Sequence, residues 1–361
     1  MELEKESHKF YKWVGELYLE LHNGTYTSQA KIKWYNRKCE FFFREVELQM
    51  AIAYITGKVS RTKIEADTVI VDKNWKDCLL NQFHDVLPGS CIERVTKDAW
   101  RIYEDIFTAL SSIRAEYHAL NLGAGTSPTL YNPLNWGFRS VIFHQPDAGA
   151  PPTGPNTQAV VLSTDPIEES GEGKWRVPAA FTAILVQFNP SGYSSYAPLA
   201  PTVPVAYTFN AQFGTFNNGR VRLQFPIQGI PSETLFFTGP SGREIAVYND
   251  RLQTGTGPGL PYIYDDIPLF WDAWDVMDYH LETREQLPFT TMTDANAFAF
   301  GPIVGAYRFS GTFGQGSTFE RYTIIRADSP MVEYYLVIDW KETHKFLKVE
   351  FPVDVLSGEA A

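Results

Sequence analysis

The sequence predicts a multidomain α+β protein in which helices come first and antiparallel strands follow. Residues 1–118 are dense in charge, with 17 Lys+Arg and 18 Asp+Glu, and Pro88 is their only proline. The other 22 prolines lie beyond residue 118, where short apolar segments alternate with Gly and Pro turn residues. Apolar spacing of three or four residues indicates helices, whereas short apolar runs bounded by turn residues indicate strands.

Three helices are predicted from this spacing before residue 90. The first covers about residues 8–21 and carries Phe10, Val14, Leu17 and Leu21 on one face. The second has Asn36 as its N-cap and stops at Gly57. The third follows the stripe Trp75, Leu79, Phe83 and Leu87 and ends at Pro88-Gly89.

A fourth helix is predicted to start at the segment SCIE. Ser90 and Glu93 have the spacing of a capping box, in which each side chain binds the other residue's backbone N–H. The apolar stripe behind it predicts a helix of about 25 residues. Its members are Ile92, Val95, Ala99, Ile102, Ile106, Leu110 and Ile113. The last three helices are expected to pack as a bundle.

The second part is expected to be β-rich. Strand segments are AFTAILVQF (180–188), GRVRLQF (219–225), YTIIRA (322–327) and EYYLVIDW (333–340). Residues 318–355 alternate well enough for two or three paired antiparallel strands. Residues 146–157 and 189–204 have the composition of loops.

Composition excludes several classes of function. The net charge of −11 argues against a nucleic-acid-binding protein, which would be basic. No apolar run reaches the length of about 18 residues that a membrane-spanning helix needs. The charged N-terminal residues lack the pattern of a secretory signal, which predicts an intracellular protein or one delivered by an unconventional route. Cys39, Cys78 and Cys91 lack CxxC spacing and are expected to be free thiols.

Three separated parts of the chain resemble one enzyme family. They are WVGELYLELHNGTYTSQAKIKWYNRKCEFFFREVE (13–47), LLNQFHDVLPGSCIERV (79–95), and the pair PLFWDAWDVMDYHLETR (268–284) and DWKETHKFLKVEFPVDV (339–355). Their motifs, order and separation are similar to those of the α-mannosidases of glycoside hydrolase family 38, especially the cytosolic and vacuolar branch.

The resemblance implies a fold and an activity. It implies the tail of a catalytic β/α barrel domain at residues 1–35, a three-helix bundle at 36–118 and an antiparallel β-sandwich at 119–361. The implied reaction is retaining hydrolysis of terminal α-D-mannose in glycans, with one carboxylate as nucleophile and another as acid and base. The implied location is cytoplasmic or vacuolar.

The resemblance also assigns three site residues. His84 matches the metal-ligand histidine of the QFHD-type motif, and the implied cofactor is a divalent metal, zinc or cobalt. Tyr26 matches the tyrosine that lines the sugar pocket in the GTYTS-type motif, and His22 is expected on the same wall. In the family the nucleophile, the acid/base carboxylate and the other metal ligands lie upstream of the GELYLELH segment. This sequence therefore resembles an internal piece of a longer enzyme.

His84 without the resemblance would be interpreted as an ordinary structural histidine. A metal site needs several converging ligands, and no HxH, HxxxH or HxD pair stands beside it. Asp85 is expected about 100° away around the same helix.

The segment Trp271–Asp278 has two interpretations. Its two tryptophans and three aspartates could form a sugar site, because aromatic faces stack on pyranose rings. The favoured interpretation is a structural edge of the β-domain with solvated aspartates, since the family's chemistry lies elsewhere.

Two hypotheses compete with the mannosidase assignment. The chain could be a catalytically inactive carbohydrate-binding or interaction protein made from the bundle and the β-domain. It could also associate with a separately encoded catalytic half, or form a homo-oligomer. Mannose-containing glycans are the expected ligands throughout, with no nucleic acid and no membrane span.

Overall fold

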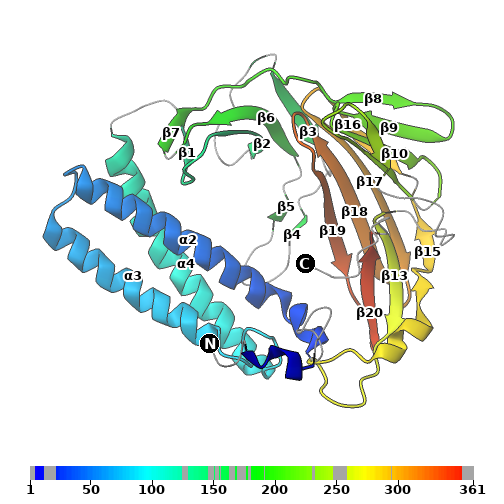
Figure 1. The fold of residues 1–361 in the computed structure, drawn as a ribbon, viewed down its shortest axis with the longest axis horizontal. Coiled ribbons are helices and arrows are strands. Elements are labelled where there is room, and N and C mark those ends of the chain that lie inside the picture. Colours follow the sequence, from blue (N-terminus) through cyan, green and yellow to red (C-terminus); the bar gives the residue numbers. More distant parts are fainter. Residues whose placement is uncertain are drawn as a thin grey trace.

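In the computed structural model the three long helices lie at the lower left of Figure 1, and the strands extend across the top and down the right side. The structure describes residues 5–11, 22–123, 129–144, 150, 154, 156–161, 167–168, 176–177, 180–190, 192–229, 232–246, 258–293 and 295–351. The mixed α+β class predicted from the sequence is confirmed.

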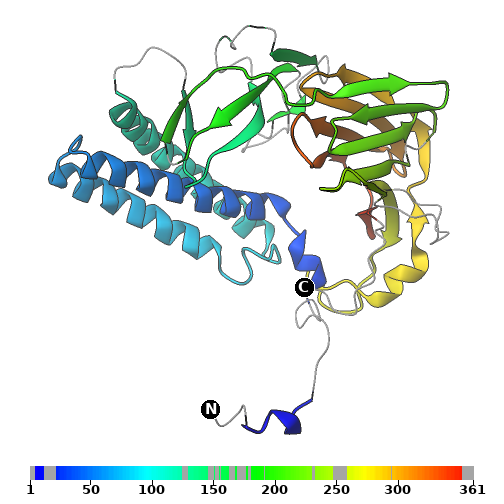
Figure 2. The same cartoon turned by 45° about the horizontal axis from the view of Figure 1, so that its top comes forward.

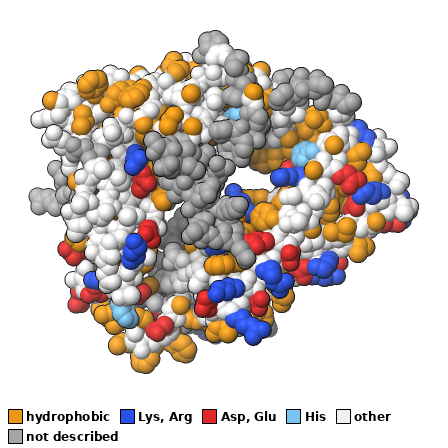
Figure 3. Space-filling model, turned by 180° about the vertical axis from the view of Figure 1, so that it is seen from behind, with side chains coloured by type: hydrophobic (Ala, Val, Ile, Leu, Met, Phe, Trp, Pro, Cys, Tyr) orange, Lys and Arg blue, Asp and Glu red, His pale blue; other side chains and the backbone are white. Residues whose placement is uncertain are grey.

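Three long helices pack against one another within this part of the chain. They are α2 (Ala30–Ile55), α3 (Arg61–Asn81) and α4 (Glu93–Leu122), and short 3₁₀ helices cover Ser7–Lys9, Asn23–Tyr26 and Asp278–Thr283. Their shared core contains Phe43, Val46, Tyr103, Ile106 and Leu110. Figure 3 shows charged side chains of both signs along the outside of the helical part. None of the described helices is both long and apolar enough to cross a membrane.

The helix boundaries differ from those predicted. The predicted helix at 8–21 lies mostly outside the described residues. Helix α2 begins at Ala30, six positions before Asn36, and Asn36 is a buried residue inside it rather than its N-cap. Its end at Ile55, ahead of Gly57 in a left-handed conformation, is as predicted.

Helix α3 ends at Asn81, and Pro88-Gly89 does not mark its end. Residues 82–89 form a series of turns, with hydrogen bonds such as Val86 N–H to Phe83 O at 2.8 Å. The predicted stripe lies only partly on the core face, because Trp75 and Leu87 pack against the helical core while Leu79 and Phe83 are exposed. The core face of α3 also carries buried residues such as Asn74 and Cys78, which apolar spacing does not detect.

The predicted capping box at Ser90 is wrong. Helix α4 begins at Glu93 with Ile92 as its N-cap, and no side chain caps it. The helix is 30 residues long, and Ala99, Ile106, Leu110 and Ile113 of the predicted stripe are buried.

All strand pairs in the described part are antiparallel. The sheet orders are β1-β7, β2-β6-β3, β4-β5, β12-β11-β10-β9-β8, β14-β13-β20, and β15-β17-β18-β19 with β16 on β17. The strands are β1 (Thr129–Asn132), β2 (Phe138–His144), β3 (Thr157–Val161), β4 (Ile167–Glu168), β5 (Arg176–Val177), β6 (Ala180–Phe188), β7 (Gly192–Ser195), β8 (Ala206–Phe209), β9 (Phe213–Asn217), β10 (Val221–Pro226), β11 (Thr234–Thr238), β12 (Glu244–Ala246), β13 (Leu260–Asp265), β14 (Glu285–Gln286), β15 (Phe289–Met292), β16 (Asn296–Phe300), β17 (Val304–Phe313), β18 (Ser317–Arg326), β19 (Val332–Asp339) and β20 (Lys345–Glu350).

Strands β17 and β18 are the inner strands of their sheet, whose orange strands lie behind the green strands of the β8–β12 sheet in Figure 2. One core joins Val304 and Ile324 to Phe181 of β6, and another joins Tyr307 and Ile325 to Phe216 of β9. Two further sheets therefore pack against this central pair.

The predicted strands are confirmed at 180–188, in the segment GRVRLQF and as the paired strands β18 and β19. Strand β20 pairs instead with β13, so residues 318–355 do not form one continuous meander. The predicted loop at 189–204 contains β7, while most of 146–157 lies outside the described residues.

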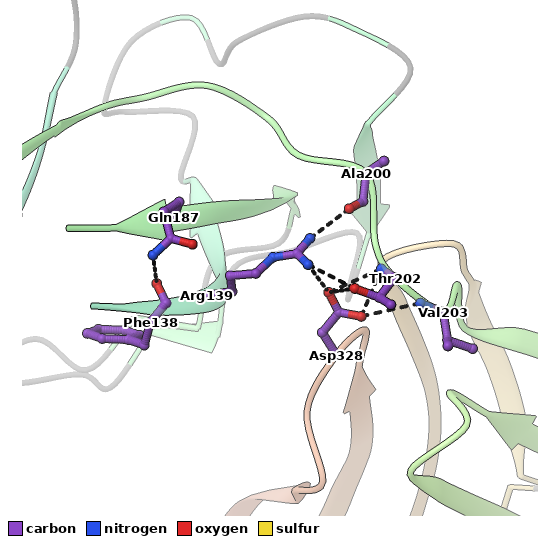
Figure 4. A network of polar contacts seen from close by, with 7 residues as sticks. All are labelled: Phe138, Arg139, Gln187, Ala200, Thr202, Val203 and Asp328. Atoms are coloured by element: carbon purple, nitrogen blue, oxygen red, sulfur yellow. Dashed lines mark hydrogen bonds and ion pairs between the residues drawn. The ribbon is translucent and has the colours of Figure 1, made fainter. Parts of the chain in front are cut away.

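Polar contacts join the parts of the fold. His118 of α4 has Nε2 2.9 Å from Glu45 Oε1 of α2 and Nδ1 2.9 Å from Tyr193 Oη of β7. In the β part, Arg139 of β2 lies 3.1 Å from the Asp328 carboxylate, which also accepts a hydrogen bond from the backbone N–H of Thr202 (Figure 4). These contacts link β2 and β7 to the helices on one side and to the central sheet on the other.

A fully buried ion pair lies inside the β part. Arg321 of β18 donates to Glu233 Oε1 at 2.8 Å, and the same carboxylate accepts from Tyr307, Thr323 and Tyr334. Both charged side chains are excluded from solvent. Burial without partners would be costly for either charge, so the hydroxyl donors stabilise the carboxylate.

We predict that Glu233→Gln lowers the free energy of unfolding by about 3–5 kcal/mol, because it leaves Arg321 buried without its counter-ion. Urea unfolding measures the change. Glu244→Gln is the control, since Glu244 pairs with Arg222 at the surface and should change stability by less than about 1 kcal/mol. Equal losses for the two variants would contradict this role of the ion pair.

Candidate functional site

An open pocket of about 510 Å³ lies where the first turns of α2 meet two connecting turns. One turn, residues 22–29, precedes α2 and carries Tyr26, and the other, residues 82–89, follows α3 and carries His84. The pocket is lined by Thr25, Tyr26, Lys33, Asn36, Arg37, Glu40, Gln82, His84, Leu87 and Pro88. The structure thus brings together two of the three residues predicted from the sequence.

Lys33 fixes the two turns to each other. Its ammonium group donates to Ser28 O at 2.5 Å and to Leu87 O at 2.8 Å, one carbonyl from each turn. Burial lowers the pKa of Lys33 to about 8, from 10.5.

Gly89 allows the turns to approach this closely. Its φ is +84°, a conformation that favours glycine, and a Cβ at this position would overlap the carbonyl oxygen of Ser28. Any larger residue at position 89 would push the two turns apart.

Tyr26 ends the short 3₁₀ helix Asn23–Tyr26 and is 58% exposed at the pocket. Thr25 beside it is buried and donates its hydroxyl to His22 O at 2.7 Å, which fixes the turn from within. The ring of Tyr26 is therefore held on an ordered turn and remains accessible to a ligand.

His22 does not line the pocket. It has a left-handed backbone, and its ring centroid lies 4.7 Å from that of Trp274. The contact joins the Tyr26 turn to the segment after β13, 252 positions later in the chain.

The His84 imidazole projects from the second turn, with 72% of its side chain exposed. Its Nε2 atom lies 3.6 Å from Asp85 Oδ2, so the expectation that Asp85 points away around a helix is wrong, because these residues are in a turn. Phe83 packs beside the imidazole with ring centroids 4.5 Å apart.

The described residues do not complete a metal site. Zinc sites use three or four protein ligands, and no group of three His, Cys, Asp or Glu residues converges anywhere in the described part of the chain. His84 and Asp85 offer at most one imidazole and one carboxylate.

The polar base of the pocket was missed by the sequence analysis. Asn36 Oδ1 accepts from Gln82 Nε2 at 3.0 Å, while its amide donates to Glu40 Oε1 at 3.1 Å. Arg37 also binds Glu40, at 2.8 Å. One signal was available: Lys33, Asn36, Arg37 and Glu40 follow helical spacing and so share a face of α2.

The Trp271–Asp278 segment docks against the Tyr26 turn. Gly24 N–H donates to Trp274 O at 3.0 Å, and Ser28 Oγ donates to Ala273 O at 3.1 Å. Figure 1 shows this yellow segment beside the blue start of α2. The turn that carries Tyr26 is thus held by the His84 turn on one side and by the β part on the other.

Comparisons with known proteins match both parts of the chain to one family. Residues 20–120 match the "Alpha mannosidase middle domain", and residues 239–361 match the "Glycosyl hydrolases family 38 C-terminal domain". Human Alpha-mannosidase 2C1 is 32% identical over 366 residues, which is 99% of this chain and 31% of the relative. The chain belongs to the α-mannosidase family, glycoside hydrolase family 38.

Other members of family 38 are also similar to this chain in sequence or in fold. The Alpha-mannosidase of Saccharomyces cerevisiae is 26% identical over 99% of this chain and 28% of its own length. A solved family 38 protein from Enterococcus faecalis has a TM-score of 0.60 at 12% identity, covering 98% of this chain and 48% of that chain. This likeness shows a shared fold. The chain spans about 30% of the length of these curated relatives.

We predict that Lys33→Met removes a pH dependence of stability. The unfolded chain binds a proton at Lys33 up to about pH 10.5, whereas the folded chain loses it near pH 8. The unfolded state therefore binds more protons between these values, and the free energy of unfolding should rise with pH across that window.

Urea unfolding at pH 8 and pH 10 checks this prediction. The rise should shrink in Lys33→Met and persist in Lys38→Met, which alters an exposed lysine of the same helix. An unchanged rise in Lys33→Met would contradict the effect of burial at this ammonium group.

Proposed function

We propose that this chain forms the middle and C-terminal part of a retaining, metal-dependent α-mannosidase that hydrolyses terminal α-D-mannose in glycans. The pocket carries this proposal. Tyr26 and His84 both line it, although 58 positions separate them in the sequence, and their match to family 38 motifs supports the proposal.

Each of the three residues predicted from the sequence has a proposed role. The accessible ring of Tyr26 packs against the sugar, as aromatic side chains do in carbohydrate sites. His84 supplies one ligand to zinc or cobalt, and a bound divalent metal would hold sugar hydroxyls and stabilise developing charge. His22 positions the Tyr26 turn through its contact with Trp274.

The nucleophile, the acid/base carboxylate and the remaining metal ligands would come from outside the described residues. Among those described, the carboxylate at the base of the pocket, Glu40, is engaged by Asn36 and Arg37. Its partners fit a structural role better than that of a nucleophile.

The finer architecture is part of the same proposal. Residues 1–35 would be the tail of the catalytic barrel, 36–118 a three-helix bundle and 119–361 a β-sandwich domain. The mutual packing of α2, α3 and α4 supports the bundle, and the antiparallel sheets around β17 and β18 support the sandwich. A cytoplasmic or vacuolar location remains the prediction, with mannose-containing glycans as partners.

A catalytically inactive carbohydrate-binding protein is the second candidate. The exposed Trp271 favours it, because an accessible tryptophan can bind sugar without any metal. The two candidates differ at His84, which only the mannosidase requires.

Release of a chromophore from an aryl α-mannoside tests the proposal. The chain is assayed alone and after coexpression with the region of human Alpha-mannosidase 2C1 that precedes the matched segment, with zinc or cobalt added. We expect turnover only in the coexpressed sample, and a loss of at least about 100-fold in His84→Ala. His8→Ala, which alters an exposed histidine that does not line the pocket, is the control.

Three outcomes would contradict the proposal. Absence of turnover from a copurified complex would argue for the binding protein. Turnover unaffected by His84→Ala would remove the metal role of this residue. Metal-dependent turnover by the chain alone would show that the catalytic carboxylates lie within these 361 residues.

A further inference from the structure

The exposed segment Leu269–Asp275, called here the rim loop, is not used by the pocket described above. Leu269, Phe270 and Trp271 are each about 70% exposed, an unusual run of large apolar side chains on a surface. Asp272 follows them directly and is also exposed. The loop thus presents an accessible aromatic ring next to an accessible carboxylate.

The rim loop is fixed beside the pocket. Its carbonyl groups at Ala273 and Trp274 accept from Ser28 Oγ and Gly24 N–H at 3.1 and 3.0 Å. A Cβ on Gly24 would lie 3.3 Å from Trp274 C, so this close approach leaves little space for a side chain at position 24. The turn of residues 22–29 therefore contributes Tyr26 to the pocket and, through Gly24 and Ser28, binds the rim loop.

The backbone of the rim loop is held in an unfavourable conformation. Trp271 and Ala273 have φ of 62° and 64°, in the left-handed region that costs non-glycine residues energy. Hydrogen bonds from Trp274 N–H and Asp275 N–H to Trp271 O, at 2.9 and 3.1 Å, hold the turn closed. Such strain persists where surrounding contacts enforce it, and it clusters at ligand-binding sites.

We propose that the rim loop is an outer subsite that binds the second sugar of a neutral α-linked mannoside. The inference rests on the proposed function, because the first sugar would occupy the pocket beside Tyr26. The Trp271 ring stacks on the apolar face of the second pyranose, and the Asp272 carboxylate accepts hydrogen bonds from its hydroxyls. Asp275 and Asp278 add negative charge nearby, which disfavours phosphorylated or acidic glycans.

The test variant is Trp271→Asn. It removes the ring, and asparagine tolerates the left-handed backbone better than tryptophan, so the loop should keep its shape. Trp136→Asn is the matched control, since Trp136 is 57% exposed on the connection between β1 and β2.

Binding of methyl α-mannoside and of methyl α-mannobiosides to the full chain is measured by calorimetric titration and by saturation-transfer NMR. We expect Trp271→Asn to weaken mannobioside binding about tenfold and to leave the monosaccharide unchanged, as loss of one stacked ring predicts. Saturation transfer to the second sugar should disappear in Trp271→Asn and persist in Trp136→Asn.

The remaining outcomes overturn the outer subsite. Equal affinities of wild type and Trp271→Asn for the mannobiosides would show that the ring binds no sugar. Equal weakening for both sugars would mean that Trp271 only supports the inner pocket. Absence of binding of either sugar to the wild-type chain would overturn both subsites, while the turnover assay judges the mannosidase proposal separately.

Discussion

The close contact between two connecting turns is the constraint on which the candidate site depends. Lys33 binds a carbonyl group of each turn, and Gly89 removes the side chain that would keep them apart. Both carbonyls would otherwise lose a hydrogen-bond partner in a partly buried place, at a cost of about 1–3 kcal/mol each. Without this contact, Tyr26 and His84 would belong to separate surface turns.

The contact extends the site across the two parts of the fold. One turn precedes α2 and the other follows α3, and the β part contacts the first turn through Ala273 and Trp274. His118 forms a second connection between helices and strands at the other end of α4. The helical and β parts are thus held at two places, which fixes the position of the rim loop relative to the pocket.

The class of fold could be predicted because composition changes sharply near residue 118 and because the β segments alternate clearly. Helix boundaries could not, since α3 places polar residues such as Asn74 and Asn81 on its core face, where apolar periodicity cannot detect them. Asn36 resembles an N-cap in sequence, yet it is buried because Gln82 and Glu40 satisfy its amide.

The candidate site was accessible from the sequence only through the family motifs around Tyr26 and His84. The polar residues of α2 that line the pocket share a helical spacing, so a search for polar rather than apolar periodicity would have found them. The docking of Trp274 on His22 could not be predicted, because the two residues are 252 positions apart in the sequence and no local pattern links them.

Hydrogen exchange of Gly89→Ala tests most directly whether the two turns form one unit. Gly57→Ala is the control, because Gly57 has a similar φ of 70° but no atom near its would-be Cβ. The account predicts faster exchange at residues 22–32 and 82–89 together in Gly89→Ala, with the core of α4 unchanged. Faster exchange confined to residues 86–90, as a purely local strain would produce, would contradict it.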